Sequence, residues 1–314
     1  MQKAKYDIIT ILGATAGGKT SLAANIAYKL NGEIISADSR QVYKGMDIGT
    51  GKDIEDYTIN NVEIPYHLID IVNAGEKYNV FEYQKDFLKI YENIKERNNF
   101  PILSGGTGMY IDAVLKGYKL INVPHSEELK FELEKKDDDE LISILKKNNE
   151  LHNRSDTSNR KRLIRAVEIA LFYEKKKSID FSFPKINSLN IQIVFDRDSR
   201  RRRISQRLKE RLQDGMIEEI EDLIKKDVPT ETLKYYGLEY KFITEYILNE
   251  ITYNEMFSRL EIAIHQFSKR QMTWFRKMEK DGHKIYKLDG SLTMENKVAK
   301  IFKLLGNYKS TETK

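Results

Sequence analysis

The sequence predicts an α/β protein, with a parallel sheet flanked by helices and a helical insertion in the middle of the chain. Short apolar, strand-like runs alternate with amphipathic helical stretches up to residue 118. The strand pattern is lost over residues 119–188 and returns in "LNIQIVF". Such alternation is typical of a parallel sheet covered by helices. We therefore expect an α/β core of residues 1–118 and 189–308, a helical insertion at 119–188 and a tail at 309–314.

The first strand–helix unit opens the chain. The β-branched run "YDIITIL" ends at Gly13, and after a glycine-rich loop Leu22, Ile26 and Leu30 recur every four residues on one helix face. Further strands are expected in "GEIISAD" (32–38), "YHLIDI" (66–71) and "FPILSGG" (100–106), with a helix at 81–97.

Amphipathic helices are expected over most of the remaining chain. In the insertion, an apolar stripe leaves Arg162 and Arg165 on another helix face. Two more helices follow the strand at 189–198, and Trp274 is expected to pack in the core. Their apolar stripes are Leu163, Ala166, Val167, Ala170 and Leu171 in the insertion, then Ile204, Leu208, Leu212 and Met216, then Met256, Leu260, Ile264 and Phe267 within 254–279.

Composition excludes several classes of protein. The 314 residues contain no cysteine, which rules out disulfides and thiolate metal sites. No run approaches the ~18 apolar residues of a membrane span. The net charge of +5 is too small to identify a polyanionic partner by itself. We expect a cytoplasmic monomer that does not bind membranes.

The loop "GATAGGKT", Gly13 to Thr20, matches the phosphate-binding pattern G-x-x-x-x-G-K-[ST] between a strand and a helix. Its amides and the helix dipole would hold phosphate oxygens, Lys19 would add charge, and Thr20 suits a magnesium ion. The expected fold is therefore P-loop NTPase-like. The expected diphosphate-binding residues are Gly13, Ala14, Thr15, Ala16, Gly17, Gly18, Lys19 and Thr20.

Asp38 ends the second strand-like run, where small-molecule kinases of this fold keep an acceptor carboxylate. It could act as a general base, or it could only cap the following turn in "ADSRQ". The residues alone leave both roles open.

Several motifs together resemble the tRNA dimethylallyltransferases, also called tRNA isopentenyltransferases. They occur in order along nearly the whole chain: "GATAGGKT", "SADSRQVYKGMDIGTGK", "YHLID", "SGGTGMYIDAVLKG", "RLIRAVEI" and "HQFSKRQMTWFRK". The resemblance implies transfer of a dimethylallyl group from dimethylallyl diphosphate to N6 of the adenosine next to the anticodon in tRNA, with release of diphosphate. It implies catalytic roles for Asp38 as base and for Lys19, Thr15 and Arg207 at the diphosphate, with Mg²⁺ as cofactor.

The same resemblance implies contacts with the anticodon stem-loop. Cations cluster at 160–165, at 200–211 and at 269–277, and the insertion is expected to grip the loop. The expected tRNA-binding residues are Asp38, Ser39, Arg40, Gln41, Thr107, Lys161, Arg162, Arg165, Lys269, Arg270, Gln271 and Arg276.

Some positions depart from the family pattern, and three other functions compete. Leu238 stands where the family usually has tyrosine, and "NRSDTSNRKR" replaces the usual approach to the Arg-Leu helix. The alternatives are an adenylate isopentenyltransferase that uses a free nucleotide, a small-molecule kinase with Asp38 as base, and a non-catalytic RNA-binding protein. The basic clusters argue against the first, and the joint presence of Lys19, Thr20, Asp38 and Arg207 argues against the last.

Overall fold

The computed structural model describes residues 5–120, 122–124, 126–148, 159–175 and 183–306. The expected tail at 309–314 lies outside these residues. The chain forms two compact units, one of Met1–Tyr118 with Lys185–Lys314 and one of Lys119–Pro184. The strand that the sequence placed from Leu189 begins one residue earlier, at Ser188.

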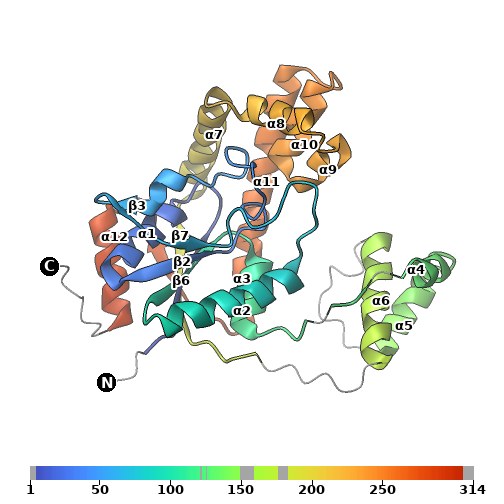
Figure 1. Ribbon diagram of the computed structural model, residues 1–314, viewed down its shortest axis with the longest axis horizontal. Coiled ribbons are helices and arrows are strands. Elements are labelled where there is room, and N and C mark those ends of the chain that lie inside the picture. Colours follow the sequence, from blue (N-terminus) through green and yellow to red (C-terminus); the bar gives the residue numbers. More distant parts are fainter. Residues whose placement is uncertain (1–4, 121, 125, 149–158, 176–182, 307–314) are drawn as a thin grey trace. The chain divides into compact units, whose positions relative to one another are not determined.

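The first unit contains a parallel sheet of six strands in the order β5-β2-β6-β1-β7-β8, which confirms the predicted α/β fold (Figure 1). A separate antiparallel pair, β3 and β4, follows a short 3-10 helix. The strands are β1 Ile8–Gly13, β2 Gly32–Ser36, β3 Thr58–Ile59, β4 Val62–Glu63, β5 Tyr66–His67, β6 Phe100–Gly105, β7 Ser188–Val194 and β8 Ile285–Asp289.

Helices cover both faces of this sheet. Ile9, Ile11 and Ile34 belong to a core shared with α1 and α12. Alternate buried residues of the same strands point to the opposite face, where α2, α3 and α11 contact the sheet. The helices are α1 Lys19–Leu30, α2 Val80–Glu96, α3 Gly108–Lys116, α7 Arg197–Gln213, α8 Met216–Lys225, α9 Thr230–Tyr236, α10 Leu238–Ile247, α11 Tyr253–Lys280 and α12 Met294–Leu305.

A second hydrophobic core joins the C-terminal helices to the segment after β2. Helices α7 to α10 gather around α11 (Figure 1). Their apolar side chains enclose Val42, Tyr43 and Met46. This packing brings α7, α9 and α10 to the segment that follows Asp38.

The second unit is a small helical body. Helices α4 Glu127–Glu134, α5 Asp138–Asn148 and α6 Arg160–Lys175 pack around Leu133, Leu141, Leu163 and Val167. No helix in the described ranges is long and apolar enough to cross a membrane.

The structure corrects four details of the sequence interpretation. The strand expected at 66–71 is only two residues long, because Leu68 and Asp70 take left-handed backbone conformations. The helix expected to continue to Met216 ends at Gln213, and Met216 starts α8 after a left-handed Gly215. On α11, Ser268 rather than Phe267 continues the buried face. Strand β8 was not predicted.

Trp274 packs against the start of α3, where Gly108 permits a close approach. A Cβ built on Gly108 would lie 2.3 Å from Trp274 Cδ1. The indole nitrogen is buried and has no hydrogen-bond partner in the described part of the chain. The ring therefore contributes to packing between α3 and α11.

We predict that Gly108→Ala lowers the free energy of unfolding by about 1–3 kcal/mol, because the added methyl overpacks this contact. Urea denaturation measures the change. The penalty should disappear in a Trp274→Ala background, where the clash is absent. An equal penalty in both backgrounds would show that the indole contact is not its cause.

Candidate active site

The loop between β1 and α1 forms an open cradle for an anion. Gly18 and Ala16 have positive φ angles of 70° and 58°, which turn the backbone around the space in front of α1. A Cβ on Gly17 would lie only 2.9 Å from the Ala14 carbonyl oxygen, so the turn is too tight there for a side chain. The first turn of α1 contains no acidic residue. The positive end of its dipole is thus left for a ligand.

Lys19 lies in this cradle with its charge only partly stabilised. Its Nζ donates a hydrogen bond to the Ala14 carbonyl at 3.0 Å. Burial, and next the positive charge of Arg207, lower the pKa of Lys19 to about 8, while Asp38 and Asp53 act in the opposite direction. An anionic ligand bound here would offset the repulsion between Lys19 and Arg207 and would stabilise the charged form of Lys19.

A cavity of about 470 Å³ opens in front of the cradle. Its lining includes Asp38 after β2, Arg207 on α7, and the turn between α9 and α10. The residues expected at the site that line it are Thr15, Gly17, Gly18, Lys19, Thr20, Asp38, Ser39, Arg40, Gln41, Thr107, Arg207, Arg270 and Gln271. The structure therefore brings the cradle, the carboxylate and the arginine of α7 to one space.

Asp38 is half-buried and held in one orientation. Its Oδ1 accepts a hydrogen bond from the backbone N–H of Arg40 at 2.9 Å. No donor among the described residues engages Oδ2. The turn-capping role that the sequence allowed is thus present, and it leaves the second oxygen able to accept a proton.

Thr107 fixes the segment that follows Asp38. Although Thr107 precedes α3, its side chain does not cap that helix. Its Oγ1 accepts instead from the backbone N–H of Ser39 at 3.0 Å. Thr107 therefore supports the loop that carries Asp38.

Two glutamines that were expected to bind RNA have their amide groups engaged within the protein. Gln271 Oε1 accepts from the Thr15 N–H at 2.9 Å, and its Nε2 donates to the Gly106 carbonyl at 3.0 Å. Gln41 accepts from Ser36 Oγ and donates to the Gly51 carbonyl. Both are buried and brace the loops around the cavity, which differs from the role that we expected for them. The Thr15 amide is likewise not free for phosphate.

Two guanidinium groups of α7 lie against Gly51. A Cβ built on Gly51 would be 1.7 Å from Arg211 Nη2 and 2.3 Å from Arg207 Nη2, and its φ is +67°. Burial, and next the neighbouring Arg211, lower the pKa of Arg207 to about 10, so it remains charged at neutral pH. The glycine is required for both its conformation and this close approach.

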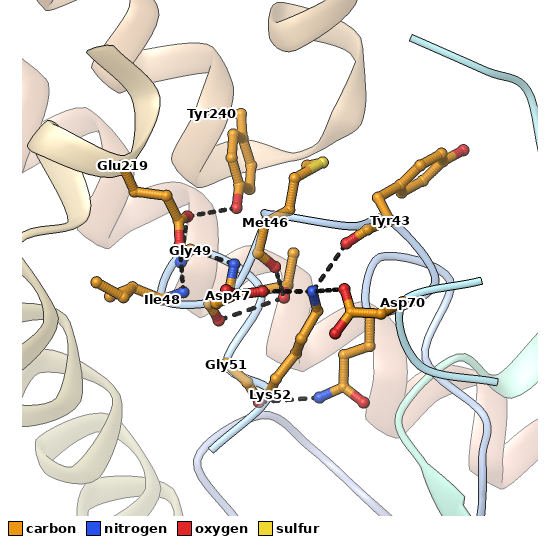
Figure 2. A network of polar contacts seen from close by, with 12 residues as sticks. Tyr43, Met46, Asp47, Ile48, Gly49, Gly51, Lys52, Asp70, Glu219 and Tyr240 are labelled. Carbon is orange, nitrogen blue, oxygen red and sulfur yellow. Dashed lines mark hydrogen bonds and ion pairs between the residues drawn. The ribbon is translucent and has the colours of Figure 1, made fainter. Parts of the chain in front are cut away.

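A polar network around the buried Lys52 holds the Gly51 loop in place (Figure 2). Lys52 is 1% exposed and contacts Asp47 at 2.5 Å, the Tyr43 carbonyl at 2.8 Å and Asp70. On the other side of the loop, Glu219 of α8 accepts from three successive amides.

The Glu219 carboxylate binds the N–H groups of Asp47 at 2.7 Å, Ile48 at 2.6 Å and Gly49 at 3.1 Å. Tyr240 of α10 donates to the same carboxylate at 2.7 Å (Figure 2). Because hydrogen bonds to charged groups are stronger than neutral ones, and because the buried Lys52 would be left without partners if the loop moved, Lys52 and Glu219 fix the position of this loop.

The expected cationic residues differ in their surroundings. In the second unit Lys161 and Arg162 are exposed, whereas Arg165 pairs with Glu168 at 2.8 Å and donates to the Val123 carbonyl. In the first unit Lys269, Arg270 and Arg276 are exposed on α11. Arg203, four residues before Arg207, donates to the Ala16 carbonyl at 2.9 Å and so supports the cradle.

The cavity also offers oxygen atoms of the kind that Mg²⁺ prefers. The Thr20 hydroxyl and the carboxylate of Asp53, which also pairs with Arg211 at 3.3 Å, line it. Across the described ranges, no three histidine or acidic side chains are grouped to hold a metal on their own. These residues fit a magnesium ion that also takes ligands from a bound phosphate.

Sequence reasoning missed the supports of this site. Glu239 lies in the cavity, and burial raises the pKa of its carboxyl group. Glu219 and Tyr240 lie in none of the quoted motifs, and Lys52 ends the motif "SADSRQVYKGMDIGTGK" without a role assigned to it. The only sign of close packing here in the sequence was the pair of glycines in "GTGKD". Gly49 lies against Tyr240, and Gly51 lies against two arginines, so neither position has room for a side chain.

We predict that Gly51→Ala weakens binding of inorganic pyrophosphate at least tenfold, because the new methyl displaces both guanidinium groups and the left-handed backbone is strained. Isothermal titration calorimetry measures the affinity. Gly282→Ala is the matched control, since Gly282 also has a positive φ, +98°, but nothing within 4 Å of a built Cβ. If both substitutions weaken binding equally, displacement of the arginines is not the cause.

Comparisons with known proteins agree with this geometry. The sequence profile of the IPP transferase family matches residues 41–278, and that of the isopentenyl transferase family matches residues 6–64. The chain is 56% identical to tRNA dimethylallyltransferase 2 of Bacteroides fragilis, over 93% of this chain and 96% of that protein. It is 54% identical to tRNA dimethylallyltransferase 2 of Phocaeicola vulgatus, over 96% and 98%.

Solved structures agree as well. The full-length tRNA isopentenylpyrophosphate transferase of Bacillus halodurans superposes with a TM-score of 0.69 at 29% identity, covering 95% of this chain and 94% of that one. A eukaryotic dimethylallyltransferase acting on tRNA gives a TM-score of 0.75 at 21% identity, covering 97% and 81%, and supports the fold alone. With this cradle, this cavity and these relatives, the chain belongs to the IPP transferase family, whose curated relatives here are tRNA dimethylallyltransferases.

Proposed function

We propose that this prenyltransferase moves the dimethylallyl group of dimethylallyl diphosphate to N6 of the adenosine next to the anticodon in tRNA. The observation that carries the proposal is the shared cavity. It holds a phosphate cradle with Lys19 and Arg207, and also an oriented carboxylate, Asp38, with one free oxygen. The same cavity therefore offers cations for a leaving diphosphate and a proton acceptor for an attacking amine.

The cradle favours departure of diphosphate. As the bond between the allylic carbon and the diphosphate oxygen breaks, negative charge grows on the leaving oxygens. Lys19 and Arg207 line the cavity in which that charge would develop, together with the amides at the start of α1. Fixed donors of this kind stabilise a transition state because they need not reorganise.

Asp38 takes the proton that the reaction releases. The N6 amine forms a bond to the allylic carbon while the carbon–oxygen bond breaks, and the diphosphate leaves with the bonding electrons. The nitrogen then carries a positive charge and readily gives a proton to Asp38 Oδ2.

Thr20 would bind Mg²⁺ together with the diphosphate, and the ion would supply charge neutralisation at the leaving oxygens.

Recognition of tRNA would rest on exposed cations of both units, among them Lys161, Arg162, Lys269 and Arg276. Because a stacked base cannot reach a carboxylate inside a cavity, the target adenosine would turn out of the anticodon loop.

The direct test is mass analysis of nucleosides after incubation of the protein with Mg²⁺, dimethylallyl diphosphate and tRNA that lacks the prenyl group. We expect prenylated adenosine in the tRNA and an equal amount of diphosphate in solution. Preferential prenylation of free AMP would assign the chain to the adenylate isopentenyltransferases. Consumption of ATP without release of diphosphate from the prenyl donor would indicate a kinase.

We predict that Asp38→Asn lowers kcat about 10²–10⁴-fold, the usual contribution of a general base. Affinity for tRNA should stay within a few-fold, because one side-chain oxygen still accepts from the Arg40 amide. Asp56→Asn, which changes another carboxylate of the cavity lining, is the control and should retain most activity. Near-normal turnover of Asp38→Asn would remove Asp38 from the role of base.

We predict that affinity for pyrophosphate falls as the pH rises above about 8. The pKa of Lys19 is lowered to about 8, so the free protein carries this charge below that pH and loses it above. Binding measured by calorimetry across pH 6.5 to 9.5 tests this, with ~1.36 kcal/mol expected per unit of pKa difference between free and bound states. The inflection should vanish in Lys19→Met, and its persistence there would assign it to another group.

A further inference from the structure

Two exposed aromatic side chains border the catalytic cavity. Tyr235, in the last turn of α9, is 74% exposed, and Phe267, on α11, is 39% exposed. Both belong to the lining of the cavity that contains Asp38 and Lys19. Single exposed aromatic residues are ordinary on protein surfaces. Here two of them, from different helices, border one functional cavity.

Each ring has a guanidinium group beside it. Arg40 Cζ lies 6.0 Å from the centroid of the Tyr235 ring, and Arg270 Cζ lies 5.9 Å from that of Phe267. A Cβ on Gly237 would lie 3.9 Å from Arg40 Nε, so the Arg40 side chain runs along the turn between α9 and α10. One face of each ring is thus supported by a cation, as in sites that bind single-stranded nucleic acid.

The two arginines keep their charge available at the edge of the cavity. Within the part of the chain that the structure describes, neither Arg40 nor Arg270 forms an ion pair with a carboxylate. Lys234, beside Tyr235, is different, because it pairs with Glu250 at 2.7 Å and with Glu231 at 3.7 Å. Phosphates that approach this edge would therefore meet Arg40 and Arg270.

Arg40 connects Tyr235 to Asp38. The backbone N–H of Arg40 holds Asp38 Oδ1 at 2.9 Å, and the Arg40 side chain reaches the Tyr235 ring. An RNA strand whose target base lies at Asp38 would pass its neighbouring nucleotide beside Arg40. Tyr235, which is 74% exposed and lines the same cavity, offers a stacking surface there.

We propose that Tyr235, supported by Arg40, and Phe267, supported by Arg270, stack on the unpaired bases that flank the target adenosine. This proposal rests on tRNA as the acceptor. When one base turns out of a loop, its neighbours lose a stacking partner. An aromatic ring replaces that partner without reading base identity, because every base has a π face.

The test compares Tyr235→Ala, Tyr235→Phe and the unchanged protein on an anticodon stem-loop RNA. We expect Tyr235→Ala to lower kcat/KM for the RNA about tenfold, which corresponds to ~1.4 kcal/mol of stacking. The KM for dimethylallyl diphosphate should not change. Tyr235→Phe should retain activity, since stacking needs the ring and not the hydroxyl. Tyr253→Ala, at an exposed tyrosine outside the cavity lining, is the matched control and should have no effect.

Abasic RNAs show whether a base is the partner of Tyr235. Two stem-loops each lack the base on one side of the target adenosine. On at least one of them the unchanged protein should lose about the same tenfold factor, and Tyr235→Ala should cause no further loss. The same cycle with Phe267→Ala should identify the other flanking position.

The inference is overturned if Tyr235→Ala has no effect, or if its loss is equally large on both abasic RNAs. Failure of the proposed function gives a different result, because the unchanged protein would then not prenylate the intact stem-loop at all.

Discussion

Three cations, Lys19, Arg207 and Arg211, lie close together around one cavity, and the rest of the site is organised around their mutual repulsion. The pKa of Lys19 is lowered by burial and by Arg207, and that of Arg207 by burial and by Arg211. Positive charges held close together repel one another, and Asp53, which pairs with Arg211 at 3.3 Å, offsets part of this repulsion. A bound diphosphate would reduce this repulsion. Its attraction to the three cations would be strongest in the transition state, when the bond to the prenyl carbon breaks and negative charge builds on the diphosphate.

The fold supplies the rigidity that such a charge arrangement needs. The parallel sheet sets the cradle after β1 and Asp38 after β2, two strands that both pair with β6, while α7 approaches from the C-terminal helices. Polar side chains then join these parts: Gln271 links α11 to the cradle, and Gln41 links the Asp38 segment to the Gly51 loop. Glu219 and Lys52 hold that loop against the two arginines. The Gly51 loop is therefore held on two sides, next to the guanidinium groups of Arg207 and Arg211.

The sequence predicted the parts of the site whose chemistry is local. The cradle could be recognised because its glycines, lysine and threonine act within one loop, and the sheet because strands and helices alternate. Motifs that resemble a family located Asp38 and Arg207. The residues that hold the loops around the site could not be predicted from local patterns. Glu219, for example, binds amides about 170 positions away in the chain.

Tertiary packing also determines which groups the glutamine side chains bind and which face of α11 is buried, and local sequence patterns do not reveal either. Gln271 and Gln41 carry amides that suit RNA as well as backbone, and only the fold shows which they bind. Phe267 matched an apolar helix stripe, yet α11 turns Ser268 into the core and leaves Phe267 at the cavity edge. Short strands such as β5 depend on left-handed residues that a hydrophobic pattern does not reveal.

The most direct measurement is a crystal structure of the protein with Mg²⁺, a thio analogue of dimethylallyl diphosphate that reacts slowly, and an anticodon stem-loop. The account predicts diphosphate oxygens on the amides at the start of α1 and on Lys19 and Arg207, with the target N6 within hydrogen-bond distance of Asp38 Oδ2. A diphosphate bound elsewhere, or an adenine turned away from Asp38, would contradict it.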